Sequence, residues 1–486
     1  MKTTIKLSLI LTITGFLLIP LLVIPESVLA DGMIIRPDHY SDRWDYLGES
    51  NQQTFINYEN GLEKMILSIG IEETTENAVW IFPVPADPDK VVIDVVTKMP
   101  QLRGEEITKK AKSNLFDIEK SLPITQIYTI PFIDWWGIST YKGTEGMLNA
   151  PSFGLGGESV ETDVIVHEQL EKEGITTEII TAKTAQALYQ YLIAKGLNIE
   201  QGSIPILDHY IGKEFTFVVS WISKQESSIG QRGIFVTFPT EKIYYPLLPT
   251  SVYGSQNIPI TIRIIGFVSP KVFNDIKDYT KISYYLDKYE WLWDENGYGY
   301  SEAEIQSMSE FFGPKLKVYE KYGATEATLE NIKYTKIEIN APSKMFIDDL
   351  WINNTTPLRT IPASFISEHL VITGILLLIL TSIITGLLAG IIVFREARSR
   401  KGLIKFGLIG IFNCFSIIGL IIATLFVKTK EIKEEDRELF AEFKKRGYST
   451  RAIQSRDLRK LGFIPLFSIL FLGISWIIIE LIKIIL

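Results

Sequence analysis

Cysteine is almost missing from this sequence of 486 residues, because Cys414 is its only thiol. Cys414 lies in an apolar run near the C-terminus, so residues 31–365 contain no cysteine. For that region the absence excludes disulfides, a thiol nucleophile, a zinc site built from cysteine and a lipid-modified N-terminal cysteine. The region must therefore be stabilised by its hydrophobic core, and its length suffices for one large or two medium domains.

Histidine is also rare, with four residues in the whole sequence. His39 and His209 are isolated from other potential ligands along the chain, as histidines on a surface or in a packed interior usually are. His167 and Asp163 would share one face of a predicted strand, because alternate residues of a strand point to the same side. One imidazole and one carboxylate are too few for a zinc site. The sequence thus predicts no metal-binding residues.

Complete catalytic motifs are missing as well. The glycine-rich stretch at residues 154–159 lacks the lysine of a phosphate-binding loop and the central serine of a hydrolase elbow. Residues 294–297 have the composition of a calcium loop, but Leu292 and Ala303 would then occupy its first and last ligand positions. We therefore predict no catalytic residues and no cofactor-binding residues.

Basic charge is scarce in the long cysteine-free region. The whole chain has a formal net charge of −8, to which residues 31–365 contribute −16 and residues 366–486 contribute +7. The acidic region would meet the phosphates of a nucleic acid with like charge, so no nucleic-acid partner is expected. The basic C-terminal region predicts contacts with anionic lipid headgroups and supplies signals for orientation in a membrane.

Long apolar runs, in contrast, are present at both ends of the chain. Residues 1–30 combine two lysines, an apolar stretch and small residues before Asp31, which predicts a cleaved signal peptide. An uncleaved anchor is the alternative, since the apolar stretch could span a bilayer. Three further runs are about long enough to cross roughly 30 Å of hydrocarbon as transmembrane helices, at residues 370–394, 403–427 and 462–486. We expect a multi-pass protein of the cell membrane with residues 31–369 outside.

The side of the membrane on which the basic loop 428–461 lies stays open. Arg395, Arg398 and their basic neighbours mark the end of the first run as cytoplasmic by the positive-inside rule. The loop also carries eleven Lys and Arg against seven Asp and Glu, yet three full crossings would place it outside. Three crossings are the favoured interpretation. The alternative is a re-entrant hairpin around Asn413, Cys414 and Ser416 that does not cross.

The exported region has the pattern of a mixed α+β fold with antiparallel strands. Residues 54–59 and 62–72 predict a hairpin, because Asn60-Gly61 tolerates the positive φ angles of a tight turn. Apolar residues three or four apart predict an amphipathic helix over residues 103–122. We expect residues 31–270 to form an α+β ectodomain, 271–345 a second α+β segment and 346–369 a membrane-proximal stalk.

The middle of the exported region has the clearest local signals. Residues 163–182 predict two strands around a turn near residues 172–174. The following helix should be capped by Thr184 and stopped by Gly196, and a shorter helix should end at residues 208–210.

The stretch VWIFPVPADP, residues 79–88, combines an apolar strand with three prolines. Both faces of the strand are apolar, which predicts a central position in a sheet. Pro83 and Pro85 cannot donate ladder hydrogen bonds and should end the strand. We expect Trp80 to be a core residue that stabilises the fold, in preference to a rim residue of a binding site.

The same stretch resembles the Trp-apolar-apolar-Pro-x-Pro segment of the family known as domain of unknown function 2330. Residues 173–222, the opening Ala30-Asp31-Gly32 and Tyr245-Pro246-Leu247 resemble further blocks of that family in matching order. The resemblance covers roughly residues 31–270 and implies an exported, often membrane-anchored protein. It implies no activity and no catalytic residues. The sequence departs from the family in lacking cysteines near the mature N-terminus.

Aromatic residues gather in the predicted long loop at residues 123–158. Exposed aromatic side chains can stack on sugars or anchor a partner, so the best candidates for ligand contact are Phe132, Trp135, Trp136 and Tyr141. The alternative is that these side chains pin the loop to the fold or rest on the membrane interface.

These observations favour a membrane-anchored cell-surface protein that acts as a non-enzymatic binding or structural module of the envelope. Its expected partners are the membrane and an envelope protein or glycan, with no cofactor. The alternative is an envelope hydrolase whose catalytic residues are dispersed in sequence and meet only in the fold. A transporter or channel is not favoured, because the apolar runs contain few central polar residues.

Overall fold

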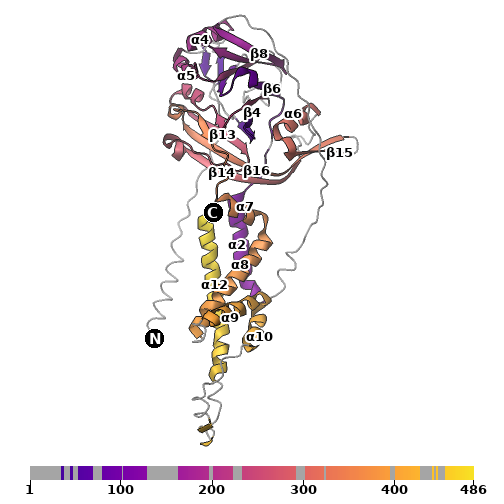
Figure 1. Ribbon diagram of the computed structural model, residues 1–486, viewed down its shortest axis with the longest axis vertical. Coiled ribbons are helices and arrows are strands. Elements are labelled where there is room, and N and C mark those ends of the chain that lie inside the picture. The colour runs from indigo at the N-terminus through magenta and orange to yellow at the C-terminus, as the bar shows by residue number, and fades with distance from the viewer. Residues whose placement is uncertain are drawn as a thin grey trace.

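The computed structural model describes residues 34–37, 44–46, 53–68, 79–100, 102–127, 163–195, 201–222, 232–291, 302–321, 324–393, 400–426, 441–442, 445–446 and 455–486. In this part of the chain a β-rich head stands on a bundle of helices, and the C-terminus lies beside the head (Figure 1). The predicted mixed class with antiparallel strands is confirmed, and three long apolar helices follow the head in the chain.

Six strands form the first sheet of the head, in the order β2-β1-β5-β10-β9-β8, and all neighbours pair antiparallel. Helix α4 (Ala185–Ala194) packs on β8 and β9, and α5 (Ile204–Asp208) packs on α4. The strands are β1 (Ile34–Pro37), β2 (Trp44–Tyr46), β5 (Val79–Val84), β8 (Val164–Lys172), β9 (Ile175–Ala182) and β10 (Thr216–Ile222).

Nine strands form the second sheet, in the order β6-β11-β4-β3-β13-β16-β14-β7, with β15 paired beside β16. The pairing of β3 with β13 is parallel. The strands are β3 (Gln53–Glu59), β4 (Leu62–Ser68), β6 (Val92–Val96), β7 (Glu105–Glu106), β11 (Gly233–Pro239), β13 (Asn257–Ile265), β14 (Thr280–Trp291), β15 (Leu316–Lys321) and β16 (Ala324–Pro342). A two-stranded sheet joins β12 (Ile243–Tyr245) to β17 (Leu350–Ile352), and α6 (Glu302–Phe312) packs on β15.

One hydrophobic cluster contains residues from both large sheets. Trp80 and Phe217 come from the first sheet, and Ile234 and Ile262 come from the second. Only 5% of the surface of Trp80 is exposed, so its predicted position in the core is confirmed. Burial of apolar surface on this scale is the main favourable contribution to the stability of a fold without disulfides.

Several elements confirm predictions that were made from short local signals. The hairpin of β3 and β4 turns at Asn60 and Gly61, whose φ angles are 54° and 80°. Glu173 and Gly174 adopt φ angles of 55° and 75° between β8 and β9. Thr184 caps α4, because its side chain accepts a hydrogen bond from the backbone nitrogen of Ala187 at 3.0 Å. Each of these structures depends on a few adjacent residues, which is why pattern alone predicted them.

Strand β5 ends directly before Pro85, as predicted, but Pro83 does not end it. The strand continues through Pro83 to Val84, and both residues pair with β10. On the other side, the described part of β1 pairs only with Val79 and Trp80. The end of β5 therefore has an edge with no described partner, and a residue without a backbone N–H is tolerated at such an edge.

The segments predicted as 31–270, 271–345 and 346–369 pair with one another in the head. β16 pairs with β13 on one side and with β14 on the other, so the second sheet contains strands from both predicted α+β segments. β17 pairs with β12. The stretch predicted as a stalk therefore contributes a strand to the head before it reaches the helices.

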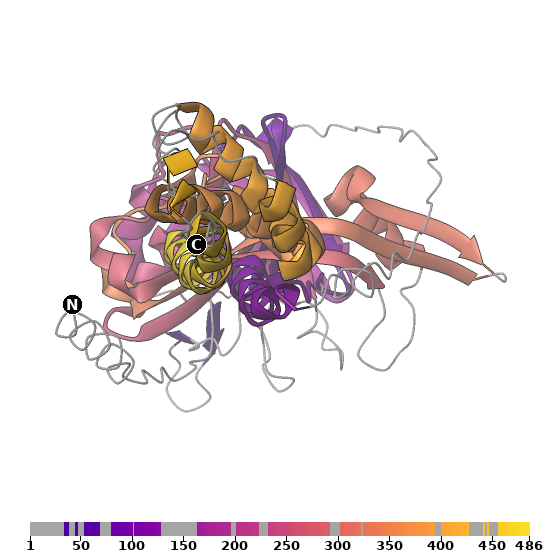
Figure 2. The same ribbon diagram turned by 90° about the horizontal axis from the view of Figure 1, so that it is seen from below.

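The helical bundle contains a helix that the sequence assigned to the ectodomain. α2 (Ile107–Thr125) packs against α7, α8 and α12, and Figure 2 shows α2 beside α12 when the bundle is viewed from below. Its predicted apolar face is confirmed, since Ala111, Leu115 and Ile118 are buried. The other helices are α7 (Thr360–Glu368), α8 (Leu370–Val393), α9 (Arg400–Ile411), the 3₁₀ helix η9 (Phe412–Phe415), α10 (Ser416–Phe426) and α12 (Ser455–Ile485).

Three stretches of 24 residues are long and apolar enough to cross a membrane, at Leu370–Val393, Lys401–Thr424 and Gly462–Ile485. The first and third lie in continuous helices. The second, predicted as one helix over residues 403–427, is divided into α9, η9 and α10, because Ser416 adopts a φ of 65°. α12 begins at Ser455, inside the segment predicted as the basic loop 428–461.

Candidate functional site

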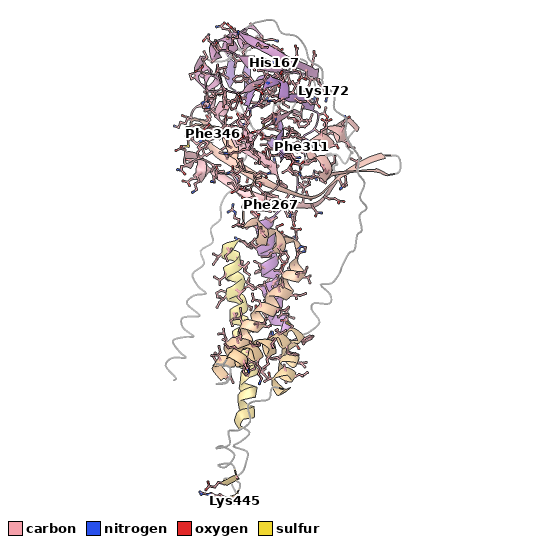
Figure 3. All side chains as sticks on the ribbon, viewed as in Figure 1. His167, Lys172, Phe267, Phe311, Phe346 and Lys445 are labelled. Carbon is pink, nitrogen blue, oxygen red and sulfur yellow. The ribbon has the colours of Figure 1, made fainter. Side chains whose placement is uncertain are left out.

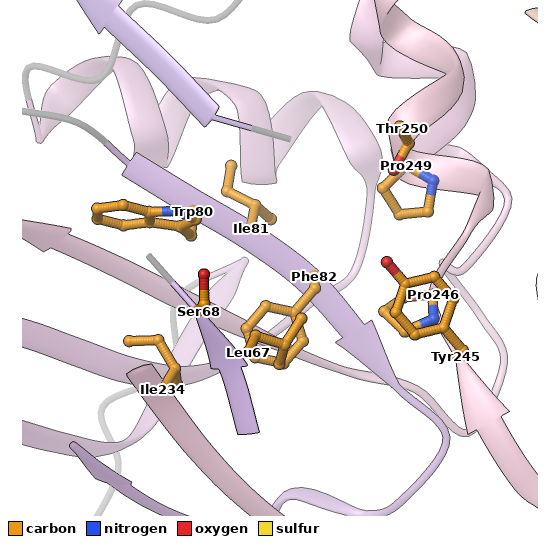
Figure 4. Close-up of a pocket in the computed structure, with 10 residues that line it drawn as sticks. All are labelled: Leu67, Ser68, Trp80, Ile81, Phe82, Ile234, Tyr245, Pro246, Pro249 and Thr250. Atoms are coloured by element: carbon orange, nitrogen blue, oxygen red, sulfur yellow. The ribbon is translucent and has the colours of Figure 1, made fainter. Parts of the chain in front are cut away.

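A small cavity lies between the two large sheets, where β5 faces β4 and β11 (Figure 4). Its volume is about 20 Å³. A water molecule needs roughly 10–15 Å³, so the cavity has room for one or two molecules of that size. Most of the lining is apolar, with Phe82, Ile234 and Pro246 among the contributing residues.

Two polar atoms in the lining have no hydrogen-bond partner among the described residues. They are the indole Nε1 of Trp80 and the hydroxyl Oγ1 of Thr250, which belongs to the 3₁₀ helix η4 (Leu248–Tyr253). Buried polar groups are normally paired, because an unpaired group has lost its hydrogen bonds to water. The pair offers one donor and one hydroxyl to a small polar molecule.

A buried carboxylate, Asp349, bonds to Tyr244 and Leu248, which are chain neighbours of the lining residues Tyr245 and Pro249. Asp349, just before β17, accepts hydrogen bonds from Tyr210 Oη at 3.0 Å, Tyr244 Oη at 2.9 Å and the backbone nitrogen of Leu248 at 2.9 Å. Burial raises the pKa of Asp349, and it also raises the pKa values of the two tyrosines. The hydrogen bonds join the turn after α5, β12 and η4 to the residue before β17, so this carboxylate holds four segments together.

A second buried carboxyl group, that of Glu63, bonds to the backbone of Tyr244. Glu63 on β4 is completely buried, and its Oε2 accepts a hydrogen bond from the backbone nitrogen of Tyr244 at 2.7 Å. Its Oε1 has no described partner. Burial raises the pKa of Glu63 well above its ordinary value. Such a shift is the effect of apolar surroundings, which disfavour the charged form of a carboxyl group.

A third acidic group, Glu178 on β9, pairs with α4 near the surface of the head. It accepts hydrogen bonds from Tyr191 Oη at 2.5 Å and Lys195 Nζ at 2.7 Å. Lys195 Nζ also lies 5.1 Å from the ring centroid of Trp221, within the range of a cation–π contact. Burial raises the pKa of Tyr191. These contacts fix α4 on the sheet, and they leave neither oxygen of Glu178 without a partner.

The structure does not bring His167 into a cluster. Its Nε2 lies 2.7 Å from Thr181 Oγ1 across a register shift of β8, and burial lowers its pKa. Figure 3 places His167 at the far end of the head from Phe267, which lies at the junction with the helices. Among the described residues no three His, Cys, Asp or Glu side chains lie close enough together to hold a metal ion.

The predicted ligand-contact residues Phe132, Trp135, Trp136 and Tyr141 lie outside the described residues. The sequence does not indicate the cavity, because the expected burial of Trp80 does not reveal what its indole nitrogen contacts. Glu63 was missed as well. A signal for Glu63 exists, because it shares a strand face with the buried Met65.

No protein-family model matches the chain, and a search of curated proteins finds no match. Solved structures of baculovirus P35 are similar over part of the chain. Mutated baculovirus P35 after caspase cleavage has 11% identity and a TM-score of 0.25, covering 63% of this chain and 100% of that chain. Baculovirus P35 itself has 10% identity and a TM-score of 0.24, covering 63% and 97%. At TM-scores of this size the likeness supports no conclusion about fold or function.

Proposed function

We propose that this protein is a membrane-anchored cell-surface protein whose head acts as a binding or structural module of the envelope without catalysing a reaction. The observation that carries the proposal is the joint between the head and the apolar helices. α2 starts directly after β7 of the head and packs along α7, α8 and α12. Lys483 near the end of α12 donates a hydrogen bond to Glu119 of α2 at 2.7 Å. The joint favours a head that is held close to the membrane.

The hydrogen bonds of the buried acids support a non-enzymatic role. Asp349 and Glu178 are saturated by tyrosine, lysine and backbone donors, and Glu63 faces the interior. A hydrolase would need an acid–base pair that faces a space large enough for substrate. The cavity beside Trp80 is of water size and has no carboxyl group in its lining.

Export of the head is part of the same proposal. The N-terminal run of residues 1–30 would direct export, and the head carries most of the acidic charge of the chain. The basic residues that follow α8 would stay in the cytoplasm by the positive-inside rule. The partners that suit this arrangement are an envelope protein or a glycan. We also propose that residues 31–270 belong to domain of unknown function 2330, on the strength of the blocks that include Trp80.

The test uses the full-length protein in the cells that produce it. Membranes are washed with alkaline carbonate, and intact cells are treated with a lysine reagent that cannot cross membranes. The protein should stay in the membrane fraction, and the exposed Lys281 of β14 should be labelled in intact cells. Release by carbonate would contradict membrane anchoring. Protection of Lys281 until the cells are opened would contradict the external head.

Binding is tested with a cleavable crosslinker of the same reagent class on intact cells. An envelope protein or glycan crosslinked to the head would support the binding role. Recovery of the protein alone, together with turnover of an ester, peptide or glycoside library by the purified full-length chain, would favour the hydrolase.

A further inference from the structure

The contact between α2 and α12 is made by charged side chains at the end of α12 that lies beside the head. Lys483 Nζ lies 2.7 Å from Glu119 and 2.8 Å from Glu480. Residues 461–479 of α12 contain no charged side chain. Nineteen helical residues rise about 28 Å, close to the roughly 30 Å thickness of the hydrocarbon layer. The charged group of Glu119, Glu480 and Lys483, called the charge belt below, therefore fits the outer boundary of that layer.

The exposed surface of α2 changes character at the same level. Above the charge belt its exposed residues include Lys112, Ser113 and Asp117. Lys120, directly after Glu119, is still exposed, and beyond it the exposed residues are apolar, with Ile124 50% exposed and Ile127 70% exposed. A polar surface that turns apolar at the level of an ion-pair cluster is the pattern of a helix that enters lipid. The last turn of α2 thus suits insertion into one leaflet.

The depth of that insertion follows from contacts with α7. Asn114 Nδ2 donates hydrogen bonds to the carbonyl oxygens of Ile366 and Ser367, just before α8 begins. From Asn114 to Gln126 the chain advances twelve residues, or about 18 Å along a helix. The tip of α2 therefore reaches roughly half the depth of α8, which has 24 residues.

A second half-depth element approaches from the opposite end of α8. α9 lies antiparallel to the second half of α8, because Gly390 meets Phe406 and Gly386 meets Gly410. η9 then brings Asn413 to the middle of α8, where its Nδ2 donates a hydrogen bond to Ser382 Oγ at 3.1 Å. α9 and α10 have 12 and 11 residues, so each rises about 18 Å or less and neither can cross alone.

The direction of the chain reverses at the break between η9 and α10. Ser416 has a φ of 65° and a ψ of −178°, which no helix contains. Gly419 of α10 lies against the carbonyl oxygen of Phe412, so the start of α10 folds over η9. Figure 1 shows α9 and α10 together at the end of the bundle away from the head. α10 therefore leaves the layer on the side from which α9 entered.

The two half-depth elements meet at one hydrogen bond. The backbone nitrogen of Ile417, the first residue after the break, donates to the carbonyl oxygen of Gln126 at the tip of α2, at 3.1 Å. Backbone groups freed by a helix break are tolerated in a membrane only where protein buries them. The tip of α2 covers the break, and Asn413 is completely buried there. The hydrogen bond thus gives a donor to the last turn of α2 and an acceptor to the break before α10.

We propose that, among the described helices, only α8 and α12 cross the membrane, while α2 inserts from the side of the head and α9–α10 inserts as a re-entrant hairpin from the opposite side. The partner of the α2 tip is the acyl-chain region of the lipid leaflet next to the head. The basic residues after α8 and the basic residues 428–461 then lie on one side, as the positive-inside rule requires. The C-terminus lies on the side of the head. This proposal rests on the membrane anchoring proposed above and adds its topology.

Single cysteines in the full-length chain test the topology, with Cys414→Ser as the background. Three exposed positions are changed in turn, giving Lys401→Cys, Lys445→Cys and Ile484→Cys. Lys445 lies at the end of the molecule opposite the head (Figure 3). In intact cells an impermeant thiol reagent should label Ile484→Cys only, and opening the cells should add Lys401→Cys and Lys445→Cys. Labelling of Lys445→Cys together with loss of Ile484→Cys labelling in intact cells would establish three crossings and overturn the proposal.

The insertion of α2 has its own matched pair, Ser113→Cys and Ile124→Cys, both exposed on the same helix. Ser113→Cys should be labelled in intact cells, and Ile124→Cys should lose labelling because lipid covers it. After transfer to a mild detergent without lipid, a small membrane-permeant thiol reagent should reach Ile124→Cys as well, which shows that its thiol is free, and an unchanged melting temperature shows that the variant is folded. Equal labelling of the two positions in membranes would overturn the insertion. Failure of Ser113→Cys to react in intact cells would instead contradict the external head.

Discussion

The head and the helical bundle are packed in opposite ways, the head with large aromatic side chains and the bundle with small residues between its helices. In the head, large aromatic side chains bring donors to buried acids, as Tyr210 and Tyr244 do for Asp349. In the bundle, small residues let helices approach so closely that Gly410 lies against the carbonyl oxygen of Ser382. Water drives apolar side chains together in the head, whereas helices in lipid gain mainly from close packing and hydrogen bonds. Removing volume should therefore harm the head most, and adding volume should harm the bundle most.

The largest effect is expected from Trp80→Ala. The change removes a side chain that is 5% exposed and that joins the two sheets. Loss of a buried tryptophan lowers the free energy of unfolding by about 3–5 kcal/mol. The yield of folded protein and the melting temperature of the full-length chain should both fall. Trp351→Ala is the control, because Trp351 is 39% exposed. A stable Trp80→Ala protein that loses only a ligand would show that Trp80 belongs to a binding site.

A smaller loss is expected from Gly410→Ala in the bundle. A Cβ at this position would lie 2.1 Å from the carbonyl oxygen of Ser382, so α8 and α9 would have to separate. Overpacking of this kind costs about 1–3 kcal/mol. Gly473→Ala on α12 is the matched control, since its Cβ would meet nothing within 4 Å. Thermal unfolding in detergent should separate the two variants, and equal melting temperatures would contradict the tight contact between α8 and α9.

The pH dependence of the head should change in Glu63→Gln. Burial raises the pKa of Glu63 above its ordinary value of 4.5, so the folded protein holds a proton that the unfolded chain releases. The stability of the wild-type head should therefore fall as the pH rises from about 4.5 towards the raised pKa. The variant cannot ionise, so its melting temperature relative to wild type should increase over that range. Parallel melting curves across the range would show that the buried carboxyl group is not responsible.

The smallest effect is expected from Glu119→Gln at the charge belt. The side chains of Glu119 and Lys483 are 27% and 20% exposed, so water screens their pairing only in part. A pair of this kind contributes about 1 kcal/mol or less. Lys483→Met should have a similar effect, and the double variant should cost no more than either single change if the pair is the cause. Additive losses would show that the two residues act separately.

Local features of this fold could be predicted from the sequence because a few neighbours determine them. The hairpin at Asn60-Gly61 and the cap at Thr184 each depend on adjacent residues. The partner of an amphipathic helix depends on the rest of the chain. The spacing of Ala111, Leu115 and Ile118 correctly showed that one face of α2 is buried, but no pattern indicated that the bundle, and not the head, would bury most of it.

The buried acids could not be found from the sequence for a similar reason. Glu63 and Tyr244 are 181 residues apart, and Tyr244 and Asp349 are 105 residues apart. A single carboxyl group in a strand is usually exposed, so the only local sign that Glu63 is buried is the strand face that it shares with Met65. The break in the second apolar run did have a local signal. Asn413 and Ser416 interrupt it, which kept the re-entrant hairpin open as an alternative.

The position of the C-terminus tests the central claim most directly. A short epitope is added after Leu486 in one variant, and in a second variant the same epitope is inserted after Gly212, in the exposed turn between α5 and β10 of the head. Antibody binding to intact cells or spheroplasts is then compared between the two. With two crossings and a re-entrant hairpin, both epitopes should bind antibody without permeabilisation. If only the head epitope binds until the membrane is opened, the chain crosses three times and the account of the bundle is wrong.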